Sequence, residues 1–376
     1  MKEIKISEIK ISEKTDLLKK IAQPLLEWYD RGHRMLPWRE KKDPYHIWVS
    51  EIMLQQTRVE AVIPYYHRFL EEFPDIGALS EAEDDKLLKC WEGLGYYSRV
   101  RNMKKAAVTV MEEYGGKMPD TWEELQKLSG IGSYTAGAIA SIAYGRPVPA
   151  VDGNVLRILS RLRMDEEFIN LQSVKKRVEE ELAEVMPIHR PGDFNQALME
   201  LGATVCIPNG APKCGECPWQ EICLARANDR TEEFPRKEAK KKRTIEKKTV
   251  LILKEYDKIA IHKRPDKGLL AGLYEFPLLE GHLGESEVIL RLKEKGLGTV
   301  RIERLPEAVH IFSHKEWHMI GYAVRVDELE QHTEVTSDYL FVDIEETEAN
   351  YPIPAAFAAY AGYMKLKLGN DRFIEE

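Results

Sequence analysis

Hydrophobic residues recur at helical spacing along the first two thirds of the chain. The first run begins at Asp16, where four apolar side chains lie three or four positions apart: Leu17, Ile21, Leu25 and Trp28. A second run follows Asp43 and Pro44, a pair typical of a helix start, and extends to Gln55. Residues 155–205 predict three more helices. We therefore expect this part of the chain to be all α-helical.

The pattern changes to that of strands after residue 248. Thr249–Leu253 and Ile259–His262 predict a hairpin, and apolar and polar residues alternate from Trp317 to Val326. One helix is expected between these strands, over Val288–Lys295. Residues 227–248 are basic and nearly without apolar side chains, which is typical of a linker. The chain therefore has two parts, one helical and one of mixed α and β structure.

A short glycine-rich turn separates two predicted helices in the middle of the helical part. Thr121 and Glu124 form the pattern of a capping box at the start of the first helix, and Ser133 is placed to cap the second. Between them, Gly130 and Gly132 allow a tight hairpin whose backbone can approach a ligand closely. The N–H groups that open the second helix carry a positive partial charge, so a phosphate is the expected ligand.

Composition narrows the class of protein. The 376 residues include 43% hydrophobic and 31% charged residues, with seven Trp and sixteen Tyr, which excludes a disordered chain. The net charge of −8 argues against a uniformly basic protein, although local clusters can still bind nucleic acid. No apolar run reaches membrane-spanning length and no signal peptide is visible, so we expect a soluble, intracellular protein.

Four of the five cysteines lie within eighteen residues: Cys206, Cys214, Cys217 and Cys223. This clustering favours a metal site over disulfides. Four thiolates satisfy either a [4Fe–4S] cluster or tetrahedral zinc, and the spacing does not choose between them.

Two acidic residues stand out for their surroundings. Glu51 shares its helix face with Ile47, Trp48 and Leu54, and such neighbours desolvate a carboxylate and raise its pKa. The alternative is a surface glutamate with apolar neighbours by chance. Asp152 follows an apolar segment, and its simplest interpretation is a helix cap.

The segments that contain these features resemble a known family. LSGIGSYTAGA followed by VPAVDGNV, together with SEIMLQQT, resembles the helix-hairpin-helix and Gly-Pro-Asp superfamily of DNA base-excision glycosylases. Within it, the chain resembles the adenine-specific glycosylases over nearly its whole length. Ser129 and Ser133 replace prolines that are common in the family hairpin, and seven residues rather than six separate Cys206 from Cys214.

The resemblance implies a multi-domain fold: an all-α helix-hairpin-helix glycosylase domain with a [4Fe–4S] cluster loop, and a C-terminal α+β Nudix-like domain that recognises 8-oxoguanine. The expected divisions are an N-terminal extension (1–15), a glycosylase domain (16–226), a linker (227–248), the Nudix-like domain (249–366) and a tail (367–376). Within the glycosylase domain, a six-helix module covers about 36–146, and the N-terminal helix joins about 147–226 in a cluster module. The Nudix-like domain is expected to lack hydrolase activity, because its helix offers only Glu294 for magnesium.

The resemblance also implies roles for individual residues. The expected catalytic residues are Glu51 as proton donor, Asp152 and Asn154 opposite the developing positive charge, and Tyr134 in the adenine pocket. The expected base-binding and duplex-wedging residues are Trp38, Arg39, Gln56, Leu94 and Tyr96. The expected 8-oxoguanine-sensing residues are Phe312, Ser313 and His314. The expected phosphate-binding residues are Gly130, Gly132 and Ser133. The four clustered cysteines are expected to hold [4Fe–4S].

Tyr134 separates this chain from one alternative. Glycosylases that also cleave the DNA backbone carry a lysine at this position, whose amine forms a Schiff base with the sugar. Tyrosine cannot form that bond, so the resemblance implies a monofunctional enzyme that removes adenine opposite 8-oxoguanine or guanine. Its expected partner is double-stranded DNA with these mispairs, and it is expected to act as a cytoplasmic, nucleoid-associated monomer.

Three alternatives remain open. The nearest is a bifunctional, endonuclease III-like glycosylase and lyase. The others are a nucleotide-pool Nudix hydrolase with a DNA-binding module, and a non-catalytic DNA sensor.

Overall fold

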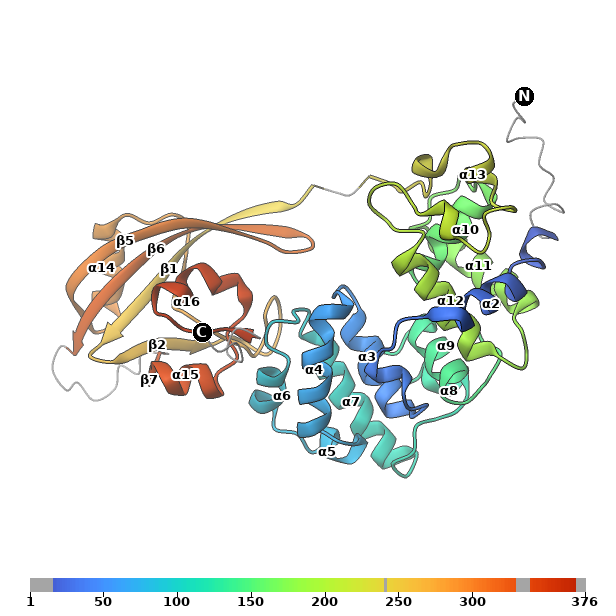
Figure 1. The fold of residues 1–376 in the computed structure, drawn as a ribbon. Coiled ribbons are helices and arrows are strands. Elements are labelled where there is room, and N and C mark those ends of the chain that lie inside the picture. The colour runs from blue at the N-terminus through green and yellow to red at the C-terminus, as the bar shows by residue number, and fades with distance from the viewer. Residues whose placement is uncertain (1–15, 240–241, 329–338, 370–376) are drawn as a thin grey trace. The chain divides into compact units, whose positions relative to one another are not determined.

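The computed structural model describes residues 16–239, 242–328 and 339–369. Within them the chain forms two compact units (Figure 1). The first holds the described residues up to Glu81 and those from Asn102 to Ala239, and the second holds Ala82–Arg101 and the described residues after 241. The expected N-terminal extension and the end of the expected tail lie outside the described ranges. The predicted domain borders stay predictions.

The helical part of the chain confirms the all-α prediction. Its α-helices are α2 (Ala22–Gly32), α3 (Pro44–Leu54), α4 (Val59–Glu72), α5 (Ile76–Ser80), α6 (Asp84–Cys90), α7 (Ser98–Glu113), α8 (Trp122–Leu125), α9 (Ser133–Ile142), α10 (Gly153–Arg163), α11 (Gln172–Val185), α12 (Pro191–Thr204) and α13 (Leu224–Ala227). Short 3₁₀ turns are η2 (Pro37–Arg39), η3 (Cys214–Glu216) and η4 (Thr231–Glu233). No helix within the described ranges is long and apolar enough to cross a membrane.

Helix starts are where the sequence pattern was least reliable. The helix predicted from Asp16 is not continuous: residues 16–18 are helical, residues 19–21 form a turn, and α2 begins at Ala22. Pro24 has no N–H to bond to the carbonyl four residues earlier, which explains the break. Thr57 and Glu60 have the sequence pattern of a capping box, but Arg58 rather than Thr57 occupies the N-cap position of α4, and no side chain caps this helix. Asp43 is confirmed as the cap of α3, where it accepts a hydrogen bond from the His46 N–H.

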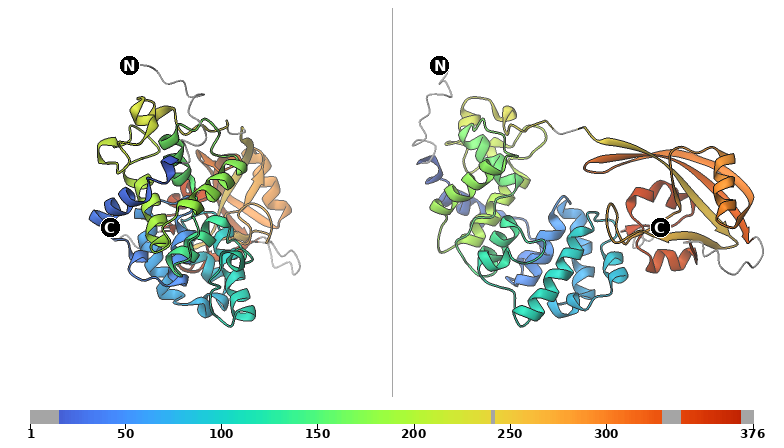
Figure 2. Two further views of the ribbon diagram at one scale, coloured as in Figure 1. Left: turned by 90° about the vertical axis from the view of Figure 1, so that its right-hand side faces the viewer. Right: turned by 180° about the vertical axis from the view of Figure 1, so that it is seen from behind.

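Helix α9 lies at the centre of the first unit. It packs against α3 on one side and α12 on the other, and all its residues from Thr135 to Ile142 are buried. Gly137 allows the close approach of the Pro149 carbonyl, because a Cβ there would lie 2.2 Å from that oxygen. A second set of helices, α2, α10, α11 and α12, shares one hydrophobic core (Figures 1 and 2). Side chains from both sets therefore meet beside α9.

The second unit is built on a mixed sheet. Its strands are β1 (Thr244–Glu255), β2 (Lys258–Lys263), β3 (Tyr274–Glu275), β4 (Leu278–Glu280), β5 (Leu297–Ile311), β6 (Lys315–Glu328) and β7 (Leu340–Asp343). The order is β3-β2-β1-β6-β5, with β4 on β1 and β7 on β2. The β1–β6 pair is parallel, in register from Thr244 with Lys315 to Lys254 with Arg325, and the other pairs are antiparallel.

Both faces of this sheet are covered, which explains the continuous apolar run in β1. Val250 and Ile252 point into one core and Leu251 and Leu253 into another. The first core includes residues of η5 (Ala355–Phe357) and α16 (Ala358–Tyr363), and the second includes residues of α14 (Glu285–Glu294). Figure 1 shows these helices on opposite faces of the sheet. The short helix α15 (Ile344–Asn350) follows β7.

Helix α14 differs from its prediction. It begins at Glu285 rather than Val288, so it carries Glu285 and Glu287 besides Glu294. Glu287 accepts a hydrogen bond from the Gly284 N–H at the helix start, and Glu294 pairs with Arg291.

Candidate active site

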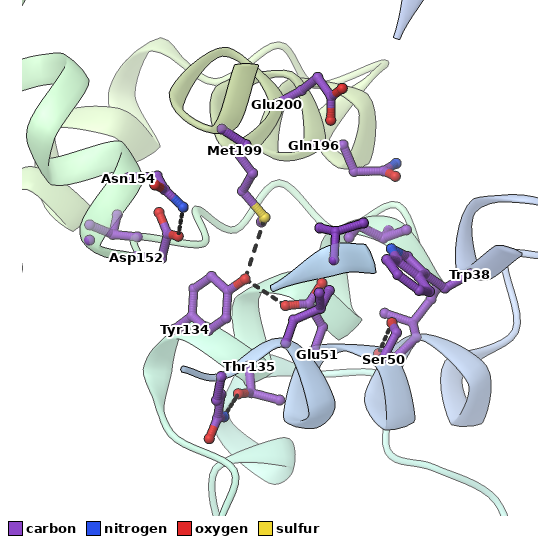
Figure 3. Close-up of a pocket in the computed structure, with 18 of the residues that line it drawn as sticks. Trp38, Ser50, Glu51, Tyr134, Thr135, Asp152, Asn154, Gln196, Met199 and Glu200 are labelled. Atoms are coloured by element: carbon purple, nitrogen blue, oxygen red, sulfur yellow. Dashed lines mark hydrogen bonds between the residues drawn. The ribbon is translucent and has the colours of Figure 1, made fainter. Parts of the chain in front are cut away.

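A cavity of about 680 Å³ opens in the first unit, beside the start of α9. Its lining includes seven residues predicted from sequence: Trp38, Arg39, Glu51, Gln56, Tyr134, Asp152 and Asn154. Gly132 and Ser133 of the hairpin border the same cavity. Figure 3 shows that Glu51, Tyr134 and Asp152 come from three separate elements and lie around one space. The fold therefore brings together groups that are up to about a hundred residues apart in sequence.

Glu51 is buried on α3 and its carboxylate is engaged by a phenol. The Tyr134 hydroxyl donates a hydrogen bond of 2.5 Å to Glu51 Oε2, and its oxygen lies 3.4 Å from Met199 Sδ (Figure 3). Burial raises the pKa of Glu51 to about 7, although the Tyr134 hydrogen bond acts to lower it. A carboxyl with this pKa holds a proton at neutral pH and can donate it.

Tyr134 stays neutral in this arrangement. Burial, and then the nearby carboxylates of Glu51 and Asp152, raise the pKa of Tyr134 well above that of an exposed tyrosine. The phenol therefore stays protonated near neutral pH and can donate its hydrogen bond to Glu51.

Asp152 both caps a helix and faces the cavity. It is the N-cap of α10: Oδ1 accepts from the Val155 N–H at 2.8 Å, and Oδ2 accepts from Asn154 Nδ2 at 2.7 Å. Burial raises the pKa of Asp152, while these two hydrogen bonds act in the opposite direction. The capping interpretation and the functional one are therefore compatible, because Asp152 is held in one orientation by its capping bonds.

Arg34, Gln196, Met199 and Glu200 are among the residues of the cavity wall that were not predicted. Glu200 is buried on α12 and binds two cations, with Arg34 Nε at 2.8 Å and Arg39 Nη2 at 2.8 Å. Burial alone would raise the pKa of Glu200, but the hydrogen bonds from Arg34 and the charge of Arg39 lower it overall. A signal was available in the sequence, since Glu200 is the one charged residue in the run Ala197–Ala203 (ALMELGA).

The residues expected to contact the base have different surroundings. Trp38 is buried and packs edge-on against Tyr66. Gln56 is exposed and has a positive φ of 62°, which is uncommon for a residue other than glycine. Gln56 lies in the turn after α3 and lines the cavity.

The hairpin before α9 has the geometry expected of a backbone binding site. Gly130 has a φ of +77°, and a Cβ there would lie 2.7 Å from that of Asn102. Gly132 is the N-cap of α9, and a Cβ there would meet no atom within 4 Å. The prediction that Ser133 caps the helix is wrong, because its hydroxyl instead donates to Glu179 and accepts from Lys175, each at 2.9 Å.

A second cavity, of about 730 Å³, lies within the second unit. It brings together five predicted residues: Leu94, Tyr96, Phe312, Ser313 and His314. Tyr96 and Ser313 hydrogen-bond through their hydroxyls at 3.2 Å. Phe312 packs edge-on against Trp317 and His310. The turn before α7 and the turn between β5 and β6 therefore face the same space.

The four clustered cysteines line one small cavity next to α10. All four are free of disulfides, and Arg161 donates a hydrogen bond to Cys206 Sγ at 3.3 Å. Within the described ranges, no group of three or more His, Cys, Asp or Glu side chains is arranged to hold a single metal ion. Four thiols around one cavity, with a cation beside one sulfur, are nevertheless a suitable set of donors for an iron–sulfur cluster.

Comparisons with known proteins agree with this architecture. A model of the HhH-GPD superfamily of base excision DNA repair proteins matches residues 49–187, and a NUDIX domain model matches residues 249–361. A solved structure of a thermostable thymine-DNA glycosylase aligns with a TM-score of 0.51 and 26% identity, over 57% of this chain and 98% of that one. The fold and the buried carboxyl of the cavity thus define a base-excision DNA glycosylase with a C-terminal Nudix-like domain, as predicted.

Curated relatives narrow the class of glycosylase. The adenine DNA glycosylase of Mus musculus is 36% identical, over 81% of this chain and 70% of the mouse protein. That of Buchnera aphidicola subsp. Acyrthosiphon pisum is 35% identical, over 81% of this chain and 86% of its own length. The chain belongs to the adenine DNA glycosylase family.

Proposed function

We propose that this glycosylase removes adenine mispaired with 8-oxoguanine, and with guanine, from double-stranded DNA in the cytoplasm, acting as a monomer. The observation that carries the proposal is the buried Glu51 carboxyl, which has a pKa of about 7 and lies on the same cavity as Asp152. Adenine is a poor leaving group until a ring nitrogen is protonated. A protonated carboxyl in a cavity large enough for a nucleoside meets that need.

The proposed reaction begins when adenine leaves the stack and enters the cavity. Trp38 and Arg39 line the cavity that receives the base, and Gln56 fills the space it leaves in the duplex. Glu51 donates its proton to the adenine ring, and the bond between the base and the sugar then breaks. Positive charge that develops on the deoxyribose is stabilised by Asp152, which Asn154 and the Val155 N–H keep in place. Water attacks the sugar, with Glu51 now ionised and able to accept its proton.

The same residues support a monofunctional reaction. A lyase step needs an amine that forms an iminium with the sugar, and the corresponding position carries Tyr134. Its hydroxyl is bonded to Glu51 and its pKa is raised, so it is not a nucleophile at neutral pH. Borohydride should therefore trap little covalent enzyme–DNA product, whereas trapping in high yield would favour the bifunctional alternative.

Separate turns are proposed to contact the DNA phosphate and the lesion. Gly130, Gly132 and Ser133 present the open start of α9 to a DNA phosphate. In the second unit, Leu94 and Tyr96 are proposed to wedge the duplex, and Phe312, Ser313 and His314 to read the base opposite adenine. The exposed hydroxyl and imidazole of Ser313 and His314 are suitable hydrogen-bond donors.

Cys206, Cys214, Cys217 and Cys223 are proposed to hold a [4Fe–4S] cluster. Three of these thiols also pack on the core of α2, α10, α11 and α12. When bound, such a cluster supplies four iron–thiolate bonds that tie the loop of residues 206–223 to that core.

The decisive experiment is a strand-scission assay, after alkali, on duplexes with adenine opposite 8-oxoguanine, guanine or thymine. Excision should be fastest opposite 8-oxoguanine, slower opposite guanine and least opposite thymine. Glu51→Gln should abolish excision while binding to the mispair persists. Equal rates on the three duplexes would refute the proposed specificity, and turnover by the Gln variant would remove Glu51 from the mechanism.

A further inference from the structure

The segment 82–101 packs as part of the second unit, although about 140 residues separate it in sequence from the rest of that unit. Helix α6 packs on α15. Near its start, Asp85 accepts hydrogen bonds from Lys263 at 2.7 Å and from the Tyr274 hydroxyl at 3.0 Å. At the far end of the segment, Arg101 donates to the Ala271 carbonyl.

A buried ion pair lies at the end of α6. Lys89 Nζ is 3.0 Å from Glu92 Oε2, and the Glu92 side chain has no exposed surface. Both oxygens of Glu92 also accept backbone N–H groups from the C-terminal part of the unit, Ile353 at 2.7 Å and Gly369 at 3.1 Å. Lys89 in turn donates to the Tyr351 carbonyl at 2.8 Å. The pair therefore fixes α6 to three backbone groups of residues 351–369.

The turn that follows Glu92 is held by hydrogen bonds next to the Lys89–Glu92 ion pair, which we call the anchor. Trp91 Nε1 donates to the Gly95 carbonyl at 3.1 Å, and Arg99 donates to the Leu94 carbonyl at 2.9 Å. Gly93 and Gly95 have positive φ angles of 99° and 68°, so the chain reverses between the anchor and Tyr96. The Tyr96 hydroxyl then meets Ser313. A chain of fixed contacts thus runs from Glu92 to the turn between β5 and β6.

We propose that Glu92 is a positioning residue that sets the place of Tyr96 relative to Ser313, and through it the preference for 8-oxoguanine over guanine opposite adenine. The inference rests on the proposed function, in which these two turns read the opposite base. Two bases that differ by few hydrogen-bonding groups can be distinguished only if the protein holds its hydrogen-bond donors in a fixed place. Glu92 supplies that fixation without touching DNA.

The test compares single-turnover excision of adenine opposite 8-oxoguanine and opposite guanine by one preparation of each variant. Glu92→Gln keeps the shape of the side chain, but it removes the negative charge opposite Lys89 and turns an NH2 group towards one of the two backbone N–H groups that Glu92 accepts. The ratio of the two rates should fall at least about tenfold, through slower excision opposite 8-oxoguanine. Partial unfolding lowers both rates by the same factor, so the ratio separates positioning from a merely structural role.

Two further variants complete the experiment. Asp85→Asn removes an exposed ion pair from the same helix and should change the ratio less than about threefold. Lys89→Met combined with Glu92→Gln also removes the ammonium that has lost its counter-charge, and it should recover part of the lost ratio. An unchanged ratio in Glu92→Gln, with a wild type that prefers 8-oxoguanine, overturns the inference alone. A wild type without preference overturns the proposed specificity instead.

Discussion

At the scale of single residues, the chemistry depends on how the protein sets the proton on Glu51. Burial favours the neutral carboxyl, and the Tyr134 hydroxyl favours the ionised form because its hydrogen bond stabilises the negative charge. Asp152 adds a nearby negative charge that again favours protonation of Glu51. A change at Asp152 should therefore alter the pH dependence of the step that uses the Glu51 proton.

The first prediction concerns that pH dependence. Since the proton donor is lost as pH rises through the pKa of Glu51, the excision rate should fall on the alkaline side of about pH 7. Tyr134→Phe removes the hydrogen bond that lowers this pKa, so the alkaline limb should move to higher pH. Single-turnover rates between pH 5 and 9 measure both effects. A limb that stays in place in the Phe variant contradicts the assigned contact.

The second prediction separates the two roles of Asp152. Asn is as good an N-cap as Asp, so Asp152→Asn should change the free energy of unfolding by no more than about 1 kcal/mol. Excision should nevertheless fall at least about a hundredfold, because the charge opposite the developing cation is gone. Thermal unfolding and single-turnover excision are measured on the same sample. A loss of only a few-fold would leave capping as the sole function of this side chain.

At the scale of elements, the hairpin before α9 contains two glycines, and each position requires or permits glycine for a different physical reason. Gly130 needs both a left-handed backbone and space beside Asn102, whereas Gly132 has an ordinary φ and open space around its Cα. The first therefore serves the fold, and the second leaves the start of α9 accessible to a ligand.

The third prediction follows from this difference. Gly130→Ala should lower the free energy of unfolding by about 2–4 kcal/mol, from left-handed strain plus the contact with Asn102. Gly115→Ala is the control. Gly115 has a φ of +60°, and a Cβ there would meet no atom within 4 Å. This variant should therefore lower the free energy of unfolding by only about 1 kcal/mol, from backbone strain alone.

Gly132→Ala should leave stability within about 0.5 kcal/mol but weaken binding to duplex DNA several-fold. Chemical denaturation and fluorescence anisotropy give the two quantities. Unchanged DNA affinity in this variant would argue against a phosphate at the start of α9.

At the scale of the whole molecule, the two units are stabilised in different ways. The second has a sheet covered on both faces. The first relies on helix packing to which the cysteine loop contributes, since Cys206, Cys217 and Cys223 lie against the core of α2, α10, α11 and α12. Binding of an iron–sulfur cluster to these thiols should therefore affect the thermal stability of the protein as well as its absorption of visible light.

The fourth prediction uses that connection. Cys214→Ala should abolish the visible absorption of the purified protein and lower its Tm, because the loop loses a ligand of the proposed cluster. Cys90→Ala is the matched control, since Cys90 lies outside the cluster loop, and it should retain the absorption. Iron content and thermal unfolding measure the outcome. Full absorption in the Cys214 variant would exclude it as a ligand.

The sequence by itself determined the local features of this protein. Helical and strand spacing gave the two kinds of fold, Asp43 and Asp152 were placed at helix starts, and the motif matches indicated Glu51 and Tyr134. These features depend on interactions between residues a few positions apart, so they can be read from the chain directly. The local patterns failed at three places. Pro24 interrupts the helix predicted from Asp16, Arg58 rather than Thr57 is the N-cap of α4, and α14 begins at Glu285 rather than Val288.

Only the tertiary structure decided which distant groups share an environment. The binding of Arg34 to Glu200 spans 166 positions, and the bonds from Glu92 to Ile353 and Gly369 span 261 and 277. No local pattern encodes such contacts, because they form when separate elements pack and exclude water from their polar groups. The raised pKa of Glu51 has the same origin, because it depends on burial by elements that pack around Glu51 only in the folded protein.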